Sequence, residues 1–269
     1  MKVLNGKELA EFIKNRHVSE CQRLITQYKV IPKLAIIVLN DNQIIDIYIR
    51  LKQKYGQDIG AVVEVHKINL NDVYSIIDVL NNDPLVHGII VQLPINDVTK
   101  TDQIVNLVKP SKDVDALGEM AIYDPATPKA ILWLLAGYNI DLINKNVLLI
   151  GRGKLVGKPL EKMLINSNVN VTVADKKTNN IKEISLLSDV IITATGQPKI
   201  LTSNMVKENS VVVDAGVASE SGKTVGDLDP DIYNRSDLTL TPVKGGVGPL
   251  TVCALFENLL IATRDSISQ

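Results

Sequence analysis

The sequence contains few aromatic residues and few cysteines, and each shortage excludes a way of stabilising the fold. Aromatic side chains make up 4% of the 269 residues, with two Phe and one Trp. The core must therefore consist of Ile, Leu and Val, a composition typical of buried parallel strands. The two cysteines, Cys21 and Cys253, form no disulfide framework. A chain of this length buries roughly three quarters of its unfolded surface, so it needs neither a disulfide nor a metal for stability.

Long apolar runs and an excess of charge of one sign are also missing. No apolar run approaches the length of a membrane span, so we expect no membrane association. The net charge is -1, which argues against nucleic-acid binding but leaves room for a local basic pocket. The sequence shows no signal-peptide pattern, and together with the low cysteine content this predicts a cytoplasmic protein. His66 and His87 have no His or Cys neighbour in sequence, so we expect no metal site.

Strand-like and helical patterns alternate in two series, which predicts an α/β fold with mostly parallel sheets in two lobes. A helical pattern at residues 7–28 precedes them, and His17 on its apolar face is expected to pack rather than to catalyse. We predict one domain at residues 1–118 plus 250–269 and another at 119–249. The strands are expected at residues 34–39, 61–68, 86–93, 147–150, 169–174, 190–194, 211–214 and 238–240.

A glycine-rich turn follows the first strand of the second series. The apolar run 147–150 ends in Gly151, Gly153 and Gly157, spaced G-x-G-x-x-x-G, and a helical pattern follows. Such a loop lets backbone approach a pyrophosphate, and the helix start offers free N–H groups and a positive dipole end. The order predicts a dinucleotide site in a Rossmann-type NAD(P)-binding domain, although any strand-to-helix turn can use glycine.

The choice between NADP and NAD depends on charged residues near the expected adenosine ribose. Asp175, at the end of the next strand, would favour the free 2′-hydroxyl of NAD. Arg152 and Lys176 would favour the 2′-phosphate of NADP through charge-assisted contacts. The cations outnumber the carboxylate, so we predict NADP and keep NAD, or a plain solvated turn, as alternatives.

Four polar residues in the first series are candidates for chemistry. Tyr48 and Lys52 stand four apart on one helical face, where burial would lower the lysine pKa enough for proton transfer. Gln92 ends a buried strand, at the edge where α/β proteins bind ligands. Asp115 follows in a loop and could accept hydrogen bonds from an amino-pyrimidine ring. The alternatives are that the Tyr48–Lys52 pair lies on a solvated helix and that Asp115 is a helix cap or a loop carboxylate.

The ordered motifs closely resemble those of the bifunctional methylenetetrahydrofolate dehydrogenase–cyclohydrolase (FolD) family, over essentially the whole chain. They are Y-x-x-x-K, G-I-I-V-Q-L-P, K-D-V-D, P-x-T-P, G-R-G-x-x-V-G-x-P and T-P-V-x-G-G-V-G-P-L-T. The resemblance implies NADP-dependent oxidation of 5,10-methylenetetrahydrofolate to the methenyl cation and hydrolysis of that cation to 10-formyltetrahydrofolate. It also implies that residues 1–118 plus 250–269 form a folate-binding catalytic domain. The further implications are a role in one-carbon metabolism and purine biosynthesis, and a homodimer.

By the same resemblance, Lys52 activates water or transfers a proton, held by Gln92 and Tyr48, and Asp115 anchors the pterin ring. The implied cofactor contacts are Gly151, Arg152, Gly153, Val156, Gly157, Lys176, Thr195, Gly196, Val217 and Gly246. The implied contacts to tetrahydrofolate derivatives are Tyr48, Lys52, Gln92, Leu93, Pro94, Asp115, Gly246 and Pro249.

Several positions depart from the family pattern. Ile45 stands where the family usually has Ser, Ala116 where it has Gly, and Ala126 where it has Cys. Ile45 motivates a first alternative, a dehydrogenase with weak or absent cyclohydrolase activity. A second alternative is a non-catalytic folate- or nucleotide-binding relative, which would bind ligand without turnover. The fold alone would also allow a two-lobed dehydrogenase acting on a hydroxy or amino acid.

Overall fold

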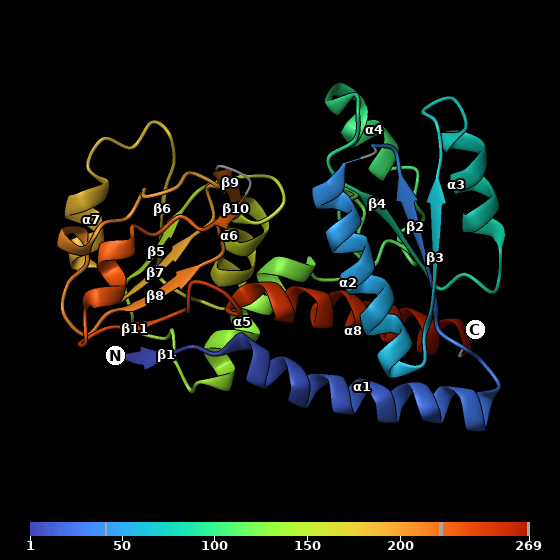
Figure 1. The fold of residues 1–269 in the computed structure, drawn as a ribbon, viewed down its shortest axis with the longest axis horizontal. Coiled ribbons are helices and arrows are strands. Elements are labelled where there is room, and N and C mark those ends of the chain that lie inside the picture. Colours follow the sequence, from blue (N-terminus) through green and yellow to red (C-terminus); the bar gives the residue numbers. More distant parts are fainter. Residues whose placement is uncertain (41, 221–222, 268–269) are drawn as a thin grey trace. The chain divides into compact units, whose positions relative to one another are not determined.

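The computed structural model describes residues 1–40, 42–220 and 223–267, and of residues 43, 44, 219 and 223 it describes only the backbone. The chain forms two compact units (Figure 1). We call the first the six-stranded unit; it comprises Met1–Ala10 and Thr127–Thr251. The second, the three-stranded unit, comprises Glu11–Ala126 and Val252–Gln269.

The three-stranded unit is a parallel sheet covered by helices on both faces. Its strands have the order β3-β2-β4. Alternate residues of β2, such as Ala35 and Ile37, face an apolar cluster with α3 and α4. Helix α2 packs so closely on β3 that a Cβ added at Gly56 would lie 2.4 Å from a Val63 methyl. The elements are α1 (Gly6–Tyr28), β2 (Lys33–Val38), α2 (Gln43–Ile59), β3 (Val62–Lys67), α3 (Val73–Asn82), β4 (Gly88–Gln92), η1 (Val98–Lys100), α4 (Thr101–Val105) and α8 (Val247–Ile267).

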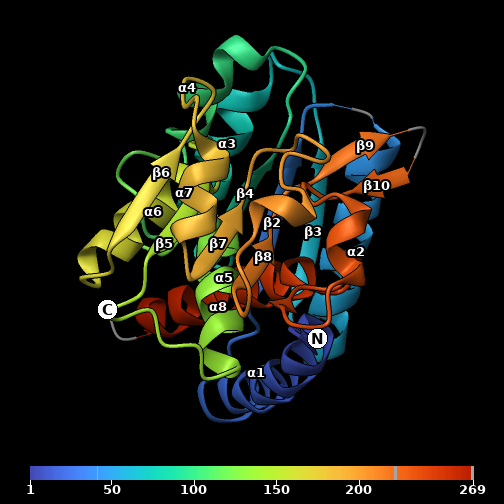
Figure 2. The same ribbon diagram turned by 90° about the vertical axis from the view of Figure 1, so that its left-hand side faces the viewer.

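The six-stranded unit is a parallel sheet of order β1-β11-β8-β7-β5-β6, in which β6, β5, β7 and β8 lie side by side (Figure 2). The chain moves from β5 outward to β6 and then returns to the other side of β5 for β7. Such a reversal creates a crevice at the carboxyl ends of the strands, where open α/β sheets bind ligands. The elements are β1 (Lys2–Val3), α5 (Ala126–Gly137), β5 (Val147–Ile150), α6 (Gly157–Asn166), β6 (Val171–Ala174), α7 (Ile181–Leu187), β7 (Val190–Thr193), η2 (Ser203–Met205), β8 (Val211–Asp214), β9 (Ala218–Glu220), β10 (Lys223–Val225), η3 (Pro230–Asn234) and β11 (Thr239–Leu240).

The first ten residues belong to a different unit from the one that the sequence-based domain bounds gave them. They belong to the six-stranded unit, whereas the predicted bounds placed residues 1–118 together. The backbone N–H of Lys2 donates to Leu238 O at 3.0 Å and that of Leu4 to Leu240 O at 2.9 Å. Strand β1 has two residues, both exposed, so it leaves no pattern in the sequence. The second boundary also shifts, since α5 from Thr127 onward lies in the six-stranded unit.

Helix α8 contains a longer apolar stretch than the sequence analysis recognised. By length and composition it could cross a membrane, and 61% of its most apolar window is buried inside the structure. From Val252 onward it supplies core residues to the three-stranded unit, including Phe256 and Leu259, which are fully buried. A buried core helix has the same composition as a membrane span, and the polar residues Glu257 and Asn258 hid its apolar length in the sequence.

Acid is expected to destabilise the three-stranded unit through His87. Its Nδ1 accepts a hydrogen bond from the backbone N–H of Lys33 at 3.2 Å, so the ring must stay neutral. Burial, with the nearby cations of Lys112 and Lys33, lowers the pKa of His87 to about 4. The unfolded chain therefore binds more protons between pH 6.5 and 4. The unfolding free energy should fall by about 2 kcal/mol across that window, since water screens part of the effect.

Denaturant titrations at several pH values test this expectation. His87→Asn keeps an acceptor near the Nδ1 position and does not titrate, so its stability should lose this acid dependence. The matched variant His66→Asn, in strand β3, should retain it. An acid dependence unchanged in His87→Asn would contradict the assignment.

Candidate active site

A buried face of α2 carries Lys52 to the end of strand β4. Ile45, Ile49 and Ile59 lie on that face and are buried, which turns Lys52 inward. The Lys52 Nζ donates a hydrogen bond to Gln92 Oε1 at 2.6 Å. The Gln92 amide is oriented in turn, because its Nε2 donates to Leu93 O at 3.0 Å. The lysine predicted from the Y-x-x-x-K motif and the glutamine predicted from the strand end are therefore in direct contact.

The loop that carries Asp115 is anchored to β4. The Ile89 N–H donates to Lys112 O at 2.7 Å, and Ile89 and Asp113 form a parallel β-bridge. The buried Asp113 carboxylate accepts the N–H groups of Leu117, at 3.4 Å, and Gly118, at 2.8 Å, and so closes the loop. These contacts explain why a loop carboxylate can be held at a defined place.

Helix α8 also supports this loop through a buried asparagine that the sequence analysis did not select. The Asn258 Nδ2 donates to Val114 O at 2.9 Å and to Asp124 O at 2.8 Å. The side chain is fully buried, and its two hydrogen bonds join the loop to the helix. The sequence signal for this role was the polar residue Asn258, which directly precedes the apolar run 259–262.

Burial and mutual charge set the protonation of Lys52 and Asp115. Burial lowers the pKa of Lys52, and the Asp115 carboxylate partly offsets that effect. Burial raises the pKa of Asp115, and the Lys52 ammonium partly offsets it. Each group thus favours its neutral form more than it would in water. An amine with a lowered pKa is neutral more often than in water and can then accept and return a proton.

Tyr48, Leu93 and Pro94 border this set. Tyr48 lies one turn before Lys52 on α2, and its side chain is 38% exposed. Leu93 and Pro94 follow β4 directly and are joined by a cis peptide bond. The structure therefore brings Lys52, Gln92 and Asp115 together in the three-stranded unit and leaves Tyr48 accessible beside them.

Ala116 occupies a backbone conformation that favours glycine. Its φ is +55°, in the left-handed region, where a Cβ costs about 1–2 kcal/mol. Ala116→Gly should therefore raise the unfolding free energy by about 0.5–1 kcal/mol, after the larger entropy of glycine in the unfolded chain is counted. Thermal denaturation can measure this gain, with Ala121→Gly in the same loop as a control, because Ala121 is outside the left-handed region. A lower melting temperature for Ala116→Gly would contradict the argument.

The glycine-rich turn after β5 has the geometry that a dinucleotide requires. Gly151 has φ +111°, and a Cβ there would lie 2.4 Å from Ala194 O. A Cβ on Gly157 would lie 2.1 Å from Gly151 O, so the helix start packs directly on the turn. By contrast, a Cβ on Gly153 would meet nothing within 4 Å. Val156, at the start of α6, gives no side-chain cap, so the turn offers open space beside helix N–H groups. These residues fit a nicotinamide dinucleotide.

The ends of β7 and β8 contribute to the same edge of the sheet. Thr195 and Gly196 follow β7, and Gly196 has φ +65°. The Thr195 N–H donates to Asp227 Oδ2 at 2.7 Å, which ties this loop to a fully buried carboxylate. Val217 follows β8 and is exposed. Asp227 was missed in the sequence because it lies 32 residues from the loop that it holds.

Among the residues predicted to select the nucleotide, Arg152 is paired with Glu161, and Asp175 and Lys176 follow strand β6. Arg152 donates from Nε to Glu161 Oε2 at 2.9 Å and from Nη2 to Glu161 Oε1 at 3.1 Å. The hydrogen bonds and charge of Glu161 raise the pKa of Arg152, and Asp175 adds to the effect. Asp175 accepts the backbone N–H of Lys177 at 2.9 Å, and Lys176 is exposed beside it. Sequence reasoning selected Arg152, Asp175 and Lys176 but not Glu161.

Gly246 and Pro249 lie in the six-stranded unit, whereas the other predicted folate contacts lie in the three-stranded unit. The loop before α8 packs against the start of the chain. A Cβ added at Gly6 would lie 1.8 Å from Gly246 O, and the Lys7 N–H donates to Gly245 O at 3.2 Å. This glycine-rich segment therefore closes on residues 5–7.

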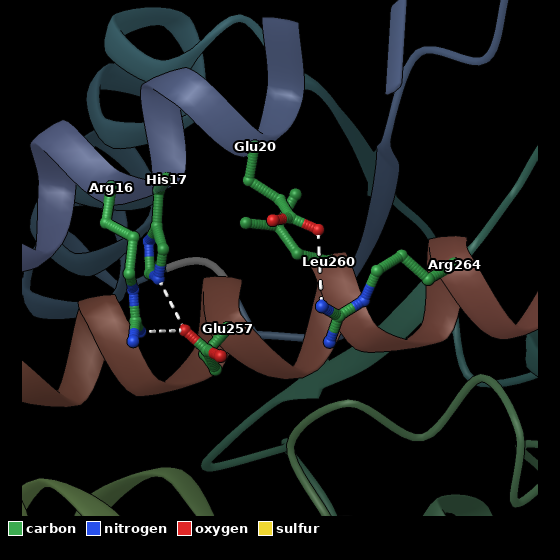
Figure 3. A pocket seen from close by; sticks show the side chains of 6 residues that line it. All are labelled: Arg16, His17, Glu20, Glu257, Leu260 and Arg264. Atoms are coloured by element: carbon green, nitrogen blue, oxygen red, sulfur yellow. Dashed lines mark hydrogen bonds and ion pairs between the residues drawn. The ribbon is translucent and has the colours of Figure 1, made fainter. Parts of the chain in front are cut away.

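A separate small pocket of about 110 Å³ lies between α1 and α8 in the three-stranded unit (Figure 3). His17 is 1% exposed there, with Nδ1 2.9 Å from Tyr55 Oη and Nε2 2.8 Å from Glu257 Oε2. Glu257 also pairs with Arg16, and Glu20 pairs with Arg264 at 3.3 Å. The packing role predicted for His17 is confirmed, since both ring nitrogens have partners. Among the residues that the structure describes, no three His, Cys, Asp or Glu side chains form a metal-binding group.

Two features, the glycine-rich turn after β5 and the buried group of Lys52, Gln92 and Asp115, together define the class of the protein. It is a two-domain α/β enzyme that uses a nicotinamide nucleotide. The sequence matches the tetrahydrofolate dehydrogenase/cyclohydrolase catalytic domain over residues 4–115 and the NAD(P)-binding domain of the same family over residues 125–267. The chain belongs to this tetrahydrofolate dehydrogenase/cyclohydrolase family, as its motifs predicted. The predicted fold class is confirmed as well.

Individual relatives agree over their full length. The bifunctional protein FolD of Lactobacillus helveticus is 36% identical over 276 residues, which cover 98% of each protein. The crystal structure of the bifunctional enzyme FolD, a methylenetetrahydrofolate dehydrogenase/cyclohydrolase from Campylobacter jejuni, has a TM-score of 0.91 and 35% identity, covering 98% of this chain and 99% of that one. The FolD enzyme of Trypanosoma brucei, solved with NADP and an inhibitor, has a TM-score of 0.91 and 28% identity over 99% and 98% of the two chains.

Proposed function

We propose that the protein oxidises 5,10-methylenetetrahydrofolate to the 5,10-methenyl cation with NADP+ and then hydrolyses that cation to 10-formyltetrahydrofolate. The observation that carries this function is the Lys52–Gln92 hydrogen bond of 2.6 Å, with Asp115 close enough to affect the Lys52 pKa. Full-length similarity to bifunctional relatives supports both reactions in one chain.

NADP+, when bound, accepts the hydride from the methylene carbon. The chain's own contribution to that step is binding and orientation. The open space at Gly153 and the start of α6 would hold the pyrophosphate, and Thr195, Gly196 and Val217 lie at the neighbouring strand ends. Arg152 and Lys176 would hold the 2′-phosphate.

Hydrolysis needs a group that moves protons. The water oxygen forms a bond to the methenyl carbon and one C–N bond breaks. One proton of the water moves to the released nitrogen and the other leaves to solvent. The Lys52 amine, with its lowered pKa, accepts a proton from the attacking water and can return it. Gln92 holds the amine through its side-chain oxygen, and the Asp115 carboxyl can bind the amino-pyrimidine part of the pterin.

A dehydrogenase without cyclohydrolase activity is not favoured by the relatives, which are described as bifunctional. The substitution that motivated it, Ile45, is 2% exposed and packs on the core-facing side of α2. Its side chain therefore has a structural role there, and Lys52 keeps its bond to Gln92 without a serine at that position.

Two separate assays test the proposal. The first follows reduction of NADP+ and, in parallel, NAD+ with methylenetetrahydrofolate; the second follows loss of methenyltetrahydrofolate without nucleotide. Turnover in both, with preference for NADP+, supports the proposed function. Turnover only with NAD+ would assign nucleotide selection to Asp175. Tight folate or nucleotide binding without turnover would favour the non-catalytic relative.

We further propose that the protein is a cytoplasmic homodimer that pairs through its NAD(P)-binding domain and supplies 10-formyl groups for purine biosynthesis. The resemblance to the family supports the dimer, and two buried cysteines that are not joined in a disulfide are compatible with a reducing compartment. Tetrahydrofolate derivatives are the proposed partners, and neither nucleic acid nor membrane is expected. Light scattering on the purified protein should give twice the chain mass; a monomer mass would contradict the dimer.

A further inference from the structure

The guanidinium predicted to bind the 2′-phosphate is already held by a carboxylate. Glu161 lies in the first turns of α6, and both of its oxygens accept from Arg152, at 2.9 and 3.1 Å. The Glu161 side chain is 18% exposed and that of Arg152 is 52% exposed. Two parallel N–H···O bonds fix the plane of the guanidinium more firmly than a single contact would.

Two negative charges act on Arg152. Asp175 acts on Arg152 as a second negative charge, and Lys176 and Lys177 follow Asp175 in the chain after β6. A 2′-phosphate brought to Arg152 would meet the Glu161 carboxylate, which accepts from the same guanidinium. The phosphate must share the remaining N–H donors and approach a like charge.

We propose that Glu161 is a specificity-determining residue that weakens the preference of this site for NADP+ over NAD+. NAD+ carries a hydroxyl in place of the 2′-phosphate, so the Glu161 charge opposes NADP+ and leaves NAD+ almost unaffected. The site is therefore tuned to accept both nucleotides. The inference rests on the proposed nucleotide-dependent function.

Calorimetric titration of the whole protein with NADP+ and NAD+ tests the inference at low ionic strength. Glu161→Gln removes the charge and keeps the shape. We expect it to tighten NADP+ binding about fivefold and to change NAD+ binding by less than about twofold, a difference of the size expected for a partly exposed charge pair. The matched control Glu183→Gln, an exposed carboxylate on α7 of the same unit, should leave both affinities unchanged.

Two further measurements separate charge from packing. The gain in NADP+ affinity should shrink in high salt, because exposed charges are screened. It should also disappear when Arg152→Gln is already present, because Glu161 acts through that guanidinium. Weaker NADP+ binding by Glu161→Gln would instead mean that the carboxylate orients Arg152 for the phosphate, and would overturn the inference. Equal changes for both nucleotides would overturn it too. A wild-type protein that binds neither nucleotide would defeat the proposed function itself.

Discussion

Replacing Lys52 by methionine is expected to lower the rate of methenyltetrahydrofolate hydrolysis by about 10²–10⁴-fold, the range that a positioned acid or base contributes. Methionine keeps much of the apolar stem but has no amine to take a proton from water. It also leaves the Gln92 Oε1 without the Lys52 donor at 2.6 Å. Single-turnover loss of the methenyl compound, measured apart from NADP+ reduction, gives the rate directly.

The pH dependence of the wild-type rate provides a second readout. Burial lowers the Lys52 pKa, so the neutral amine is more abundant than in water and the hydrolysis rate should rise with pH through that lowered pKa. Lys54→Met is the matched control, since Lys54 is an exposed lysine on the same helix, paired with Asp58 at 2.7 Å. It should keep both rate and pH profile. If the hydrolysis rate of the Lys52→Met enzyme stayed within about threefold of the wild-type rate, Lys52 would have no catalytic role in hydrolysis.

Gly157→Ala is expected to weaken NADP+ binding by at least about 30-fold and to lower the unfolding free energy by about 1–3 kcal/mol. The added Cβ would lie 2.1 Å from Gly151 O and 2.8 Å from the Arg152 Cα, and both neighbours are backbone. The turn after β5 can make room only by moving away from the start of α6. That movement would spoil the two features a pyrophosphate needs, a close backbone and aligned N–H groups.

Gly153→Ala separates binding from stability in the same turn. Its Cβ would meet nothing within 4 Å, so the melting temperature should stay within about 2 °C of wild type. NADP+ binding should still weaken, because the methyl group would occupy the space open to the pyrophosphate. Calorimetry and thermal denaturation of both variants give the comparison. If Gly153→Ala bound NADP+ as wild type does, the pyrophosphate would have to lie elsewhere in the unit.

The glycine-rich turn between β5 and α6 could be predicted from the sequence. The strand, the glycines and the helix follow one another within about twenty residues, and each leaves a pattern in its own short stretch of sequence. Lys52, Gln92 and Asp115 were selected for their residue types and motif positions. Their contacts depend on parallel strand pairing and on the loop that Asp113 and Asn258 hold, which no local pattern encodes.

Most features that the sequence analysis missed depend on a contact between two residues whose spacing in the chain follows no local period. Strand β1 has two exposed residues and exists only because β11 offers hydrogen bonds. Asp227 supports Thr195 from 32 residues away, and Glu161 is nine residues from Arg152, a spacing without a regular period in either helix or strand. Helix α8 was ambiguous for a different reason, since apolar composition alone cannot distinguish lipid from a protein interior.

The division of the chain has a consequence for its biosynthesis. The core of the three-stranded unit includes residues from Val252 onward, such as Phe256, which the ribosome adds only after the entire six-stranded unit. At a translation rate of roughly 5–20 residues per second, that helix is synthesised on the order of ten seconds after the strands β2, β3 and β4. During this interval the nascent sheet lacks the cover that α8 provides. Chaperone capture should therefore concentrate on the early segment, residues 33–92, while translation continues.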